Sequence, residues 1–192
     1  MSWIETIEPE DASGDLASIY LALIKSHGGV DQVMKIHSLR PATMSAHLSL
    51  YQAVLHHSEN KVPRWLLEAI GVLVSSINSC EYCLSHHFEG MSRALGDRAR
   101  ALAFKAALTR GEIEGIDVTV KERAALHYAS RLTKEPARAD SSWVAELRQS
   151  GWSDGEILEI NQVAAYFSYV NRVVLGLGCS SSDEILGRSP EK

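Results

Sequence analysis

The sequence is poor in the features that mark several classes of protein. Its 192 residues contain only three cysteines, too few to staple a small secreted fold with disulfides. No long run of lysine or arginine is present and the net charge is −5, which argues against nucleic acid as a partner because phosphate binding needs a concentrated basic face. The most apolar stretch, residues 69–77, is far too short to span a membrane. We therefore expect neither a nucleic-acid-binding protein nor a membrane protein.

What is present is typical of a folded cytoplasmic protein. Apolar residues make up 45% of the chain and charged residues 22%, and the length suits one domain over residues 1–192 with a sizeable core. The first residues lead into an acidic stretch and not into a basic and then apolar one, so no signal peptide is predicted. In the cytoplasm, a close pair of cysteines is more often catalytic or metal-binding than structural.

Helical periodicity runs through almost the whole chain, and no pair of alternating segments flanks a hairpin turn, so the predicted fold class is all-α. The apolar spacing predicts helices over residues 16–27, 41–55, 64–78, 80–95, 97–108, 121–133, 141–149 and 153–174. Pro41 and Pro63 suit helix starts, and Ser153 with Glu156 predicts a capping box. Residues 64–78 are apolar on nearly every side, which predicts that this helix is central.

A weak internal repeat is also visible. Residues 67–70 ahead of Cys80 align with residues 158–161 ahead of Asn171 at the same spacing, so residues 121–178 are a candidate degenerate second copy. Asn171 then stands where the first copy has Cys80 and is expected to be structural. Amphipathic helices often match by chance, and both duplication and coincidence stay open.

The stretch around Cys80 holds residue types that suit thiol chemistry. Cys80, Cys83 and His87 lie at positions i, i+3 and i+7, so a helix projects all three from one face, and the two cysteines lie within disulfide reach. A helix N-terminus and a nearby imidazolium can lower a cysteine pKa from about 8.5 to between about 3.5 and 7.5. We expect Cys83, four residues from His87, to be ionised and to be the nucleophile. Its sulfenic acid would condense with Cys80 to a disulfide, which an external dithiol must reduce.

Glu68 is the candidate partner of the imidazole. It lies in an otherwise apolar segment, where a buried carboxylate needs a partner. If the chain reverses near residues 78–79, Glu68 lies level with Gly90 and about one helical turn from His87. There it would orient and charge the imidazole, which in turn favours thiolate. The alternative is an exposed glutamate on the helix rim.

These residues resemble a family motif. Glu68, eleven residues, then Cys-x-x-Cys-x-x-x-His is similar to the core motif of the alkylhydroperoxidase D and carboxymuconolactone decarboxylase family, with the strong likeness over residues 63–96. The segment from Asn78 to His87, read as Asn-x-Cys-x-Tyr-Cys-x-x-His-His, resembles the family's branch of peroxidase-related proteins. The resemblance implies a multi-helix bundle with a catalytic helical hairpin in mid-chain.

It also implies an activity, the reduction of hydroperoxides by a dithiol–disulfide cycle with no cofactor beyond the disulfide. Cys83 resembles the peroxidatic cysteine and Cys80 the resolving one, while Glu68 and His87 resemble the proton relay. The implied partners are a hydroperoxide, a lipoyl or thioredoxin-like reductant and further copies of the chain. Tyr82 stands where the characterised alkylhydroperoxidase has a histidine, and a phenol is no base at neutral pH, so the rate, reductant and substrate are open.

Three alternatives remain beside this hypothesis. Two thiolates with His87 and Glu68 could ligate zinc, although a cysteine pair that heads a helix favours redox use. A carboxymuconolactone-type decarboxylase is the second, but decarboxylation does not need two adjacent thiols. The third is a redox sensor or interaction protein whose disulfide changes its assembly.

The other histidines and the third cysteine are interpreted as bystanders. His86 is expected to point away from the site as a surface or interface residue, and the pair His56 and His57 to suit a helix C-terminus as cations. Cys179 is expected to have neither a base nor a partner nearby and to be inert. The histidines without any spacing partner are His27, His37, His47 and His127.

Overall fold

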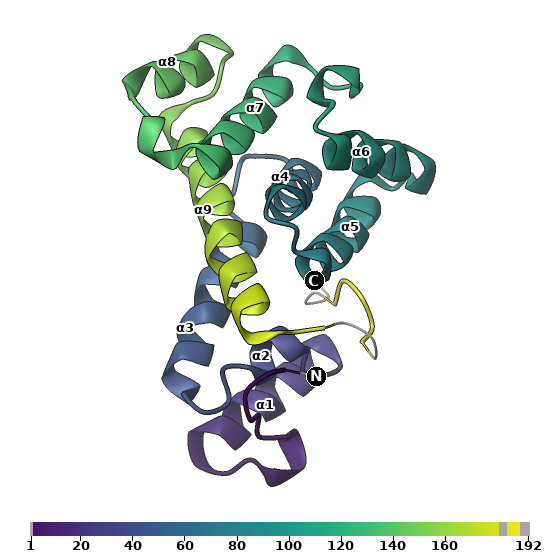
Figure 1. Cartoon of the computed structure of the whole chain (residues 1–192), viewed down its shortest axis with the longest axis vertical. Helices are drawn as coiled ribbons and strands as arrows, with labels where there is room; N and C mark the ends of the chain where they lie inside the picture. The colour runs from purple at the N-terminus through teal and green to yellow at the C-terminus, as the bar shows by residue number, and fades with distance from the viewer. Residues whose placement is uncertain (1, 181–183, 189–192) are drawn as a thin grey trace.

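The computed structural model describes residues 2–180 and 184–188 and confirms the all-α class: this part of the chain holds helices and turns but no strand (Figure 1). The α-helices are α1 (Gly14–His27), α2 (Gln32–Lys35), α3 (Pro41–Tyr51), α4 (Arg64–Ile77), α5 (Glu81–Leu95), α6 (Arg98–Arg110), α7 (Val120–Lys134), α8 (Ser141–Gln149) and α9 (Asp154–Leu177). Each predicted helix is present to within a few residues. The single turn of α2 was not predicted, because four residues are too few for an apolar period to show.

Helix α4 is central, as its composition predicts. Every residue from 66 to 75 is buried, and α4 packs against α5, α6, α7 and α9 (Figure 1). Gly71 lets α9 approach closely, since a Cβ there would lie 2.5 Å from Cζ of Phe167. The predicted capping box at the start of α9 is confirmed, with Ser153 and Glu156 bonded reciprocally.

The hairpin of α4 and α5 carries the cysteine motif. The chain reverses at Asn78 and Ser79, and Ser79 adopts a positive φ of 56°. Beyond the turn, α5 passes Glu68 at Gly90, where a Cβ would lie only 2.5 Å from Glu68 Oε1. The predicted register of Glu68 with Gly90 is therefore confirmed, and the glycine makes room for the carboxylate.

Helices α1 to α3 form a second packing unit at one end of α9 (Figure 1). They have a small apolar core of their own, made by Leu16, Tyr20, Leu23, Met34 and Met44. Helix α3 continues as a wider π-helical turn, Gln52–His56, which packs on α4 and α9. This unit faces the cysteine hairpin. None of the described helices combines the length and the apolar character needed to cross a membrane.

Candidate functional site

The two motif cysteines are buried free thiols at the start of α5. Cys80 is the N-cap residue, and it accepts hydrogen bonds from the Cys83 thiol and from the Cys83 backbone N–H, which together lower the pKa of the Cys80 thiol. The thiol–thiol hydrogen bond and burial raise the pKa of Cys83 well above its usual range. A single negative charge on the pair is therefore favoured on Cys80. This direction runs against the expectation of an ionised Cys83, because the helix N-terminus stabilises a thiolate on the first cysteine and not on the second.

Asn171 of α9 lies beside both sulfurs. Its amide is fully buried, donates to Ser75 Oγ at 3.1 Å and accepts from Asn78 Nδ2 at 3.0 Å. Its side chain also hydrogen-bonds to Cys80 and Cys83, which favours the ionised form of each. Sequence reasoning treated Asn171 as structural only. Its alignment with Cys80 in the weak repeat was the one signal that linked it to the motif.

Glu68 and His87 form the expected pair. Glu68 is 2% exposed, so the exposed-rim alternative is wrong, and its Oε2 lies 2.7 Å from His87 Nδ1. Arg64 Nε donates to the other carboxylate oxygen at 3.0 Å. Burial alone would raise the pKa of Glu68, but the charges and hydrogen bonds of His87 and Arg64 outweigh it and lower that pKa to about 2. The carboxylate is thus ionised at any physiological pH and holds Nδ1 of the ring.

Arg64 and His56 extend this pair, and sequence reasoning missed both. The Arg64 guanidinium lies 2.8 Å from His56 Nδ1 as well as bonding Glu68. Burial and the adjacent guanidinium lower the pKa of His56 to about 4, so the ring is neutral. The expectation of a cationic His56 is therefore wrong, whereas His57 is exposed. The spacing of Arg64 four residues before Glu68 was the available signal.

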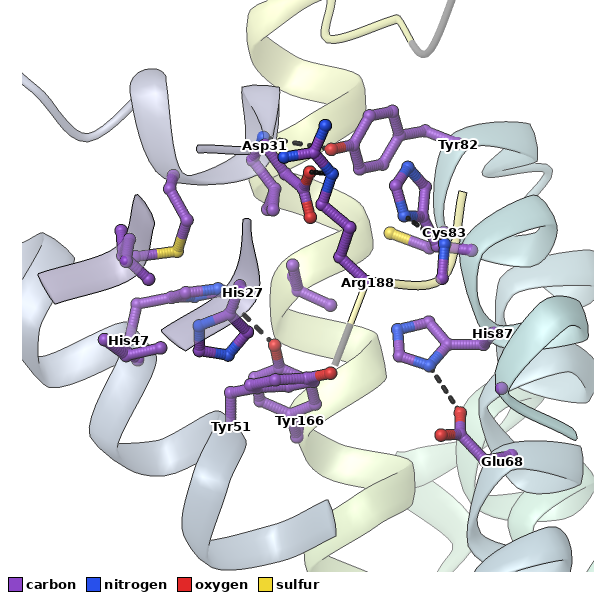
Figure 2. Close-up of a pocket in the computed structure, with 18 of the residues that line it drawn as sticks. His27, Asp31, His47, Tyr51, Glu68, Tyr82, Cys83, His87, Tyr166 and Arg188 are labelled. Carbon is purple, nitrogen blue, oxygen red and sulfur yellow. Dashed lines mark hydrogen bonds and ion pairs between the residues drawn. The ribbon is translucent and has the colours of Figure 1, made fainter. Parts of the chain in front are cut away.

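A pocket opens between the α4–α5 hairpin and the α1–α3 unit. It encloses about 770 Å³ of empty space, including the part open to solvent. Cys83, His87 and Glu68 lie on one side, and Figure 2 shows His27, His47, Tyr51 and Tyr166 on the other. Asp31 and Arg188 form an ion pair of 3.6 Å beside them. Apolar side chains complete the lining: Leu23, Val33, Met34, Leu48 and Val170. Cys80 does not line this pocket, so Cys83 is the sulfur that a bound molecule would meet.

His86 contradicts its expected surface position. It is only 9% exposed and lines the pocket, because residues 184–188 fold back over α5 and cover it. His86 Nε2 lies 3.1 Å from Glu184 Oε2, and Nδ1 accepts from the Gly187 N–H at 3.2 Å. Nothing in the local helical period reveals a contact with a segment about a hundred residues later.

Tyr82 also lines the pocket, and Cys179 lies beside it. The Tyr82 hydroxyl accepts from the Val33 N–H at 3.1 Å, and burial raises the pKa of this phenol far above neutrality, so it is no base. Burial likewise raises the pKa of Cys179 to about 12. Its thiol is protonated, but it does have a partner, since Tyr82 hydrogen-bonds to it. The expectation that Cys179 lacks any neighbour is wrong, although a protonated thiol fits its expected low reactivity.

The remaining histidines divide between the pocket and the surface. His127 pairs with Glu114 at 2.7 Å on the outside of the molecule and is a bystander, as expected. His47 and His27 line the pocket, and His37 packs on His47 with ring centroids 5.0 Å apart. As for zinc, no group of three or more His, Cys, Asp or Glu side chains is arranged to hold a metal ion in the part of the chain that the structure describes.

Solved structures with this architecture come from several sources. The chain superposes with a TM-score of 0.82 on the alkylhydroperoxidase AhpD core of an uncharacterized peroxidase-related protein from Ralstonia eutropha JMP134, at 22% identity over 99% of this chain and 98% of that one. The chain thus has the AhpD fold. A peroxidase-related protein from Silicibacter sp. TM1040 gives a TM-score of 0.80 at 23% identity, over 93% of this chain and 91% of that one.

A third AhpD-fold neighbour is named for a different reaction. The debrominase Bmp8, as a cysteine-to-alanine variant in complex with 2,3,4-tribromopyrrole, gives a TM-score of 0.75 at 22% identity over 95% of each chain. No protein-family model and no curated protein matches the sequence. At these identities the neighbours establish the fold, and the reaction has to be argued from the site.

Proposed function

We propose that this AhpD-fold protein is a thiol peroxidase of the alkylhydroperoxidase type, with Cys83 as the peroxidatic and Cys80 as the resolving cysteine. One observation carries the proposal: the sulfur of Cys83 lines a pocket together with an imidazole, His87, which a buried and ionised Glu68 holds in place. The peroxidase-related names of two structural neighbours support the same class of activity.

The shared proton between the two thiols suggests how Cys83 attacks. The Cys83 thiol donates to the Cys80 thiolate, so the proton passes to Cys80 as the Cys83 sulfur bonds to the distal peroxide oxygen. The O–O bond breaks, and the alkoxide takes a proton from His87 and leaves as the alcohol. Glu68 stabilises the imidazolium before that transfer. Cys83 is then a sulfenic acid.

The second half of the cycle closes the disulfide. The Cys80 thiol passes its proton to the now neutral His87, attacks the Cys83 sulfur and expels hydroxide, which takes that proton and leaves as water. The sum is two thiols and a hydroperoxide converted to a disulfide, an alcohol and water. An external dithiol, a lipoyl or thioredoxin-like protein, reduces the disulfide by exchange and completes the cycle.

Peroxide consumption in the presence of a chemical dithiol tests this function. We expect turnover in the wild type and in Cys179→Ser, and no turnover above background in Cys83→Ser. In the absence of the dithiol, Cys80→Ser should consume about one equivalent of peroxide and stop, because its sulfenic acid has no resolving partner. A wild-type rate equal to that of Cys83→Ser would refute the proposal. Decarboxylase activity that survives replacement of both Cys80 and Cys83 would favour the decarboxylase-type alternative.

Reductive dehalogenation of an aromatic ring is a second candidate, favoured by the aromatic lining beyond Cys83 and by the debrominase among the neighbours. This reaction would use the same two cysteines as the reductant: an aryl bromide and two thiols give the arene, hydrogen bromide and the Cys80–Cys83 disulfide. Bromide release from 2,3,4-tribromopyrrole, without peroxide, measures it. Release that depends on Cys83 and exceeds peroxide turnover would replace the first proposal by this one.

Assembly and location belong to the same proposal. We infer a cytoplasmic homo-oligomer, in keeping with the composition and with the family likeness. Light scattering on the reduced protein measures the number of subunits. The same measurement after mild peroxide treatment tests the sensor alternative, which requires the mass to change when the disulfide forms.

A further inference from the structure

The wall of the pocket opposite Cys83 contains buried imidazole nitrogens with nothing to bond to. His47 is only 4% exposed, and among the described residues its Nδ1 has no hydrogen-bond partner. Nε2 of His27 is in the same position. The second nitrogen of each ring is engaged: His47 Nε2 lies 3.4 Å from the Tyr166 hydroxyl, and His27 Nδ1 lies 2.6 Å from Ser26 Oγ. A buried polar atom left unsatisfied costs about 1–3 kcal/mol, so two beside one pocket call for a ligand.

This wall carries no charge. Burial, followed by the neighbouring His37, lowers the pKa of His47 to about 4, and burial lowers that of His27. Burial raises the pKa values of Tyr51 and Tyr166 far above neutrality, so both phenols keep their protons. An ionised group placed here would lose its hydration without meeting an opposite charge.

The charged groups of the pocket already have partners. Asp31 and Arg188 face each other, and Arg93 donates to the Gly187 carbonyl oxygen. Glu68 is bonded to His87 and Arg64. Within the described part of the chain, Asp31 Oδ1 and Arg188 Nε also lack a hydrogen-bond partner, but these two groups neutralise each other as an ion pair. The uncommitted hydrogen-bonding capacity that carries no charge lies on the imidazoles across from Cys83 (Figure 2).

The same wall is built of aromatic faces. The rings of Tyr51 and Tyr166 have centroids 6.1 Å apart, and those of His47 and Tyr166 lie 5.8 Å apart. Rings at such distances pack against a further ring by offset or edge contacts. Leu48 and Val170 add apolar surface beside them.

We propose that the pocket takes an uncharged aromatic hydroperoxide that carries a hydroxyl or carbonyl oxygen at the end remote from the peroxide bond. The remote oxygen bonds the imidazoles of His47 and His27, the ring packs against Tyr51 and Tyr166, and the peroxide reaches Cys83. A neutral imidazole nitrogen donates or accepts according to its tautomer, so a hydroxyl group suits either state. The peroxide end of this substrate rests on the proposed peroxidase function, whereas the recognition of the remote end does not.

Binding of three alcohols to the reduced wild-type protein tests recognition of the remote end without any peroxide chemistry. The probes are 2-phenylpropan-2-ol and its ring-hydroxylated analogues, in the para and meta isomers, and calorimetric titration gives the dissociation constants. We expect the tighter-binding of the two phenol isomers to have a dissociation constant about tenfold lower than that of the parent alcohol. This is the effect of one added buried hydrogen bond.

Three variants test whether the tighter binding of the phenol depends on the imidazoles opposite Cys83. His47→Phe should lose the preference for the phenol while it still binds the parent alcohol, and His47→Gln, which keeps a hydrogen-bonding group, should retain part of it. His57→Phe, at an exposed histidine, should keep the full preference. If His47→Phe does not fold, as its thermal unfolding will show, His27→Phe carries the same comparison. Equal affinity of the wild type for all three alcohols, or a preference that persists in both His47→Phe and His27→Phe, would overturn the inference.

The outcome separates this inference from the peroxidase proposal. Phenol preference without peroxide turnover would leave the recognition site standing and remove the peroxidase. Peroxide turnover without any phenol preference would leave the peroxidase proposal standing and remove the recognition site.

Discussion

At the scale of single residues, the site divides two tasks between two sulfurs. Cys80 at the helix N-terminus holds the negative charge, and Cys83 faces the pocket. Asn171 connects the two because its amide hydrogen-bonds to both. Two thiols that share one proton can hold a thiolate at Cys80 while Cys83, which faces the pocket, stays protonated. A protonated thiol is protected from adventitious oxidation.

Replacement of Asn171 tests its part in that arrangement. We expect Asn171→Ala to raise the pKa of the first thiol ionisation by about one unit, since the lost hydrogen bond favours the thiolate. The pH dependence of alkylation by iodoacetamide, in a Cys179→Ser background, measures this. Asn161→Ala is the matched control, because Asn161 lies on the same helix and bonds the Tyr128 hydroxyl instead. An unchanged alkylation profile in Asn171→Ala would show that its amide has no influence on the thiols.

The carboxylate of Glu68 gives a second test at this scale. Glu68→Gln keeps the size of the side chain but removes the charge that stabilises the His87 imidazolium, and we expect peroxide turnover to fall by about 10²-fold. Glu159→Gln, at a half-buried carboxylate that accepts from the Lys61 and Val62 N–H groups away from the pocket, should leave the rate unchanged. Turnover within twofold of the wild type in Glu68→Gln would exclude a role for the carboxylate in proton transfer.

At the scale of helices, a glycine sets how closely α4 and α5 approach each other. Gly90 on α5 leaves the space that Glu68 of α4 occupies, and an added methyl group would collide with the carboxylate. We expect Gly90→Ala to displace Glu68 from His87 and to reduce turnover at least tenfold, with a loss of stability of about 1–3 kcal/mol from overpacking.

Gly176 provides the matched comparison. It lies within α9 with nothing near its missing Cβ, so Gly176→Ala should leave turnover unchanged and raise stability by about 0.5–1 kcal/mol through its helix propensity. Urea unfolding and peroxide turnover of the two variants measure both effects. Full activity in Gly90→Ala would show that the close approach of α5 is not needed to hold the acid–imidazole pair.

The helices are also the scale at which the sequence is most informative. Apolar period and capping residues predicted the bounds of α4, α5, α8 and α9 closely, and the reversal at residues 78–79 was enough to place Glu68 beside His87. The helix bounds and the pairing of Glu68 with His87 both depend on contacts between residues within about twenty positions of each other. The far wall of the pocket and the cover over His86 come from α1–α3 and from residues 184–188, and no local pattern encodes contacts made at such separations. The charge on Cys80 escaped prediction because it depends on which thiol accepts the helix N–H.

At the scale of the whole molecule, two neutral imidazoles, one buried and one half-buried, link stability to pH. The pKa values of His47 and His56 are held at about 4 in the folded protein, against 6.5 for a free side chain. Between these values the unfolded chain binds more protons, so stability is present at neutral pH and is lost as the pH falls from about 6.5 to 4. Glu68 adds a further loss between its ordinary 4.5 and about 2. Asp31, whose pKa burial raises to about 6, acts in the opposite direction.

A comparison of variants isolates the contribution of His47. Urea midpoints at about pH 7 and about pH 5 should show a smaller acid destabilisation in His47→Gln than in the wild type, by roughly 1–2 kcal/mol. His127→Gln, at a partly exposed histidine, should follow the wild type. Parallel pH profiles for the wild type and His47→Gln would mean that His47 is not held neutral by the fold.

The most direct test of the central claim traps the first oxidised sulfur. Reduced Cys80→Ser is treated with one equivalent of cumene hydroperoxide and the sulfenic-acid reagent dimedone, and the labelled residue is read from the peptide masses. The division of tasks between the two sulfurs predicts an adduct on Cys83 alone, and a Cys80–Cys83 disulfide with no adduct in the wild type. An adduct on Cys179 in place of Cys83, or a wild type that forms no Cys80–Cys83 disulfide, would contradict it.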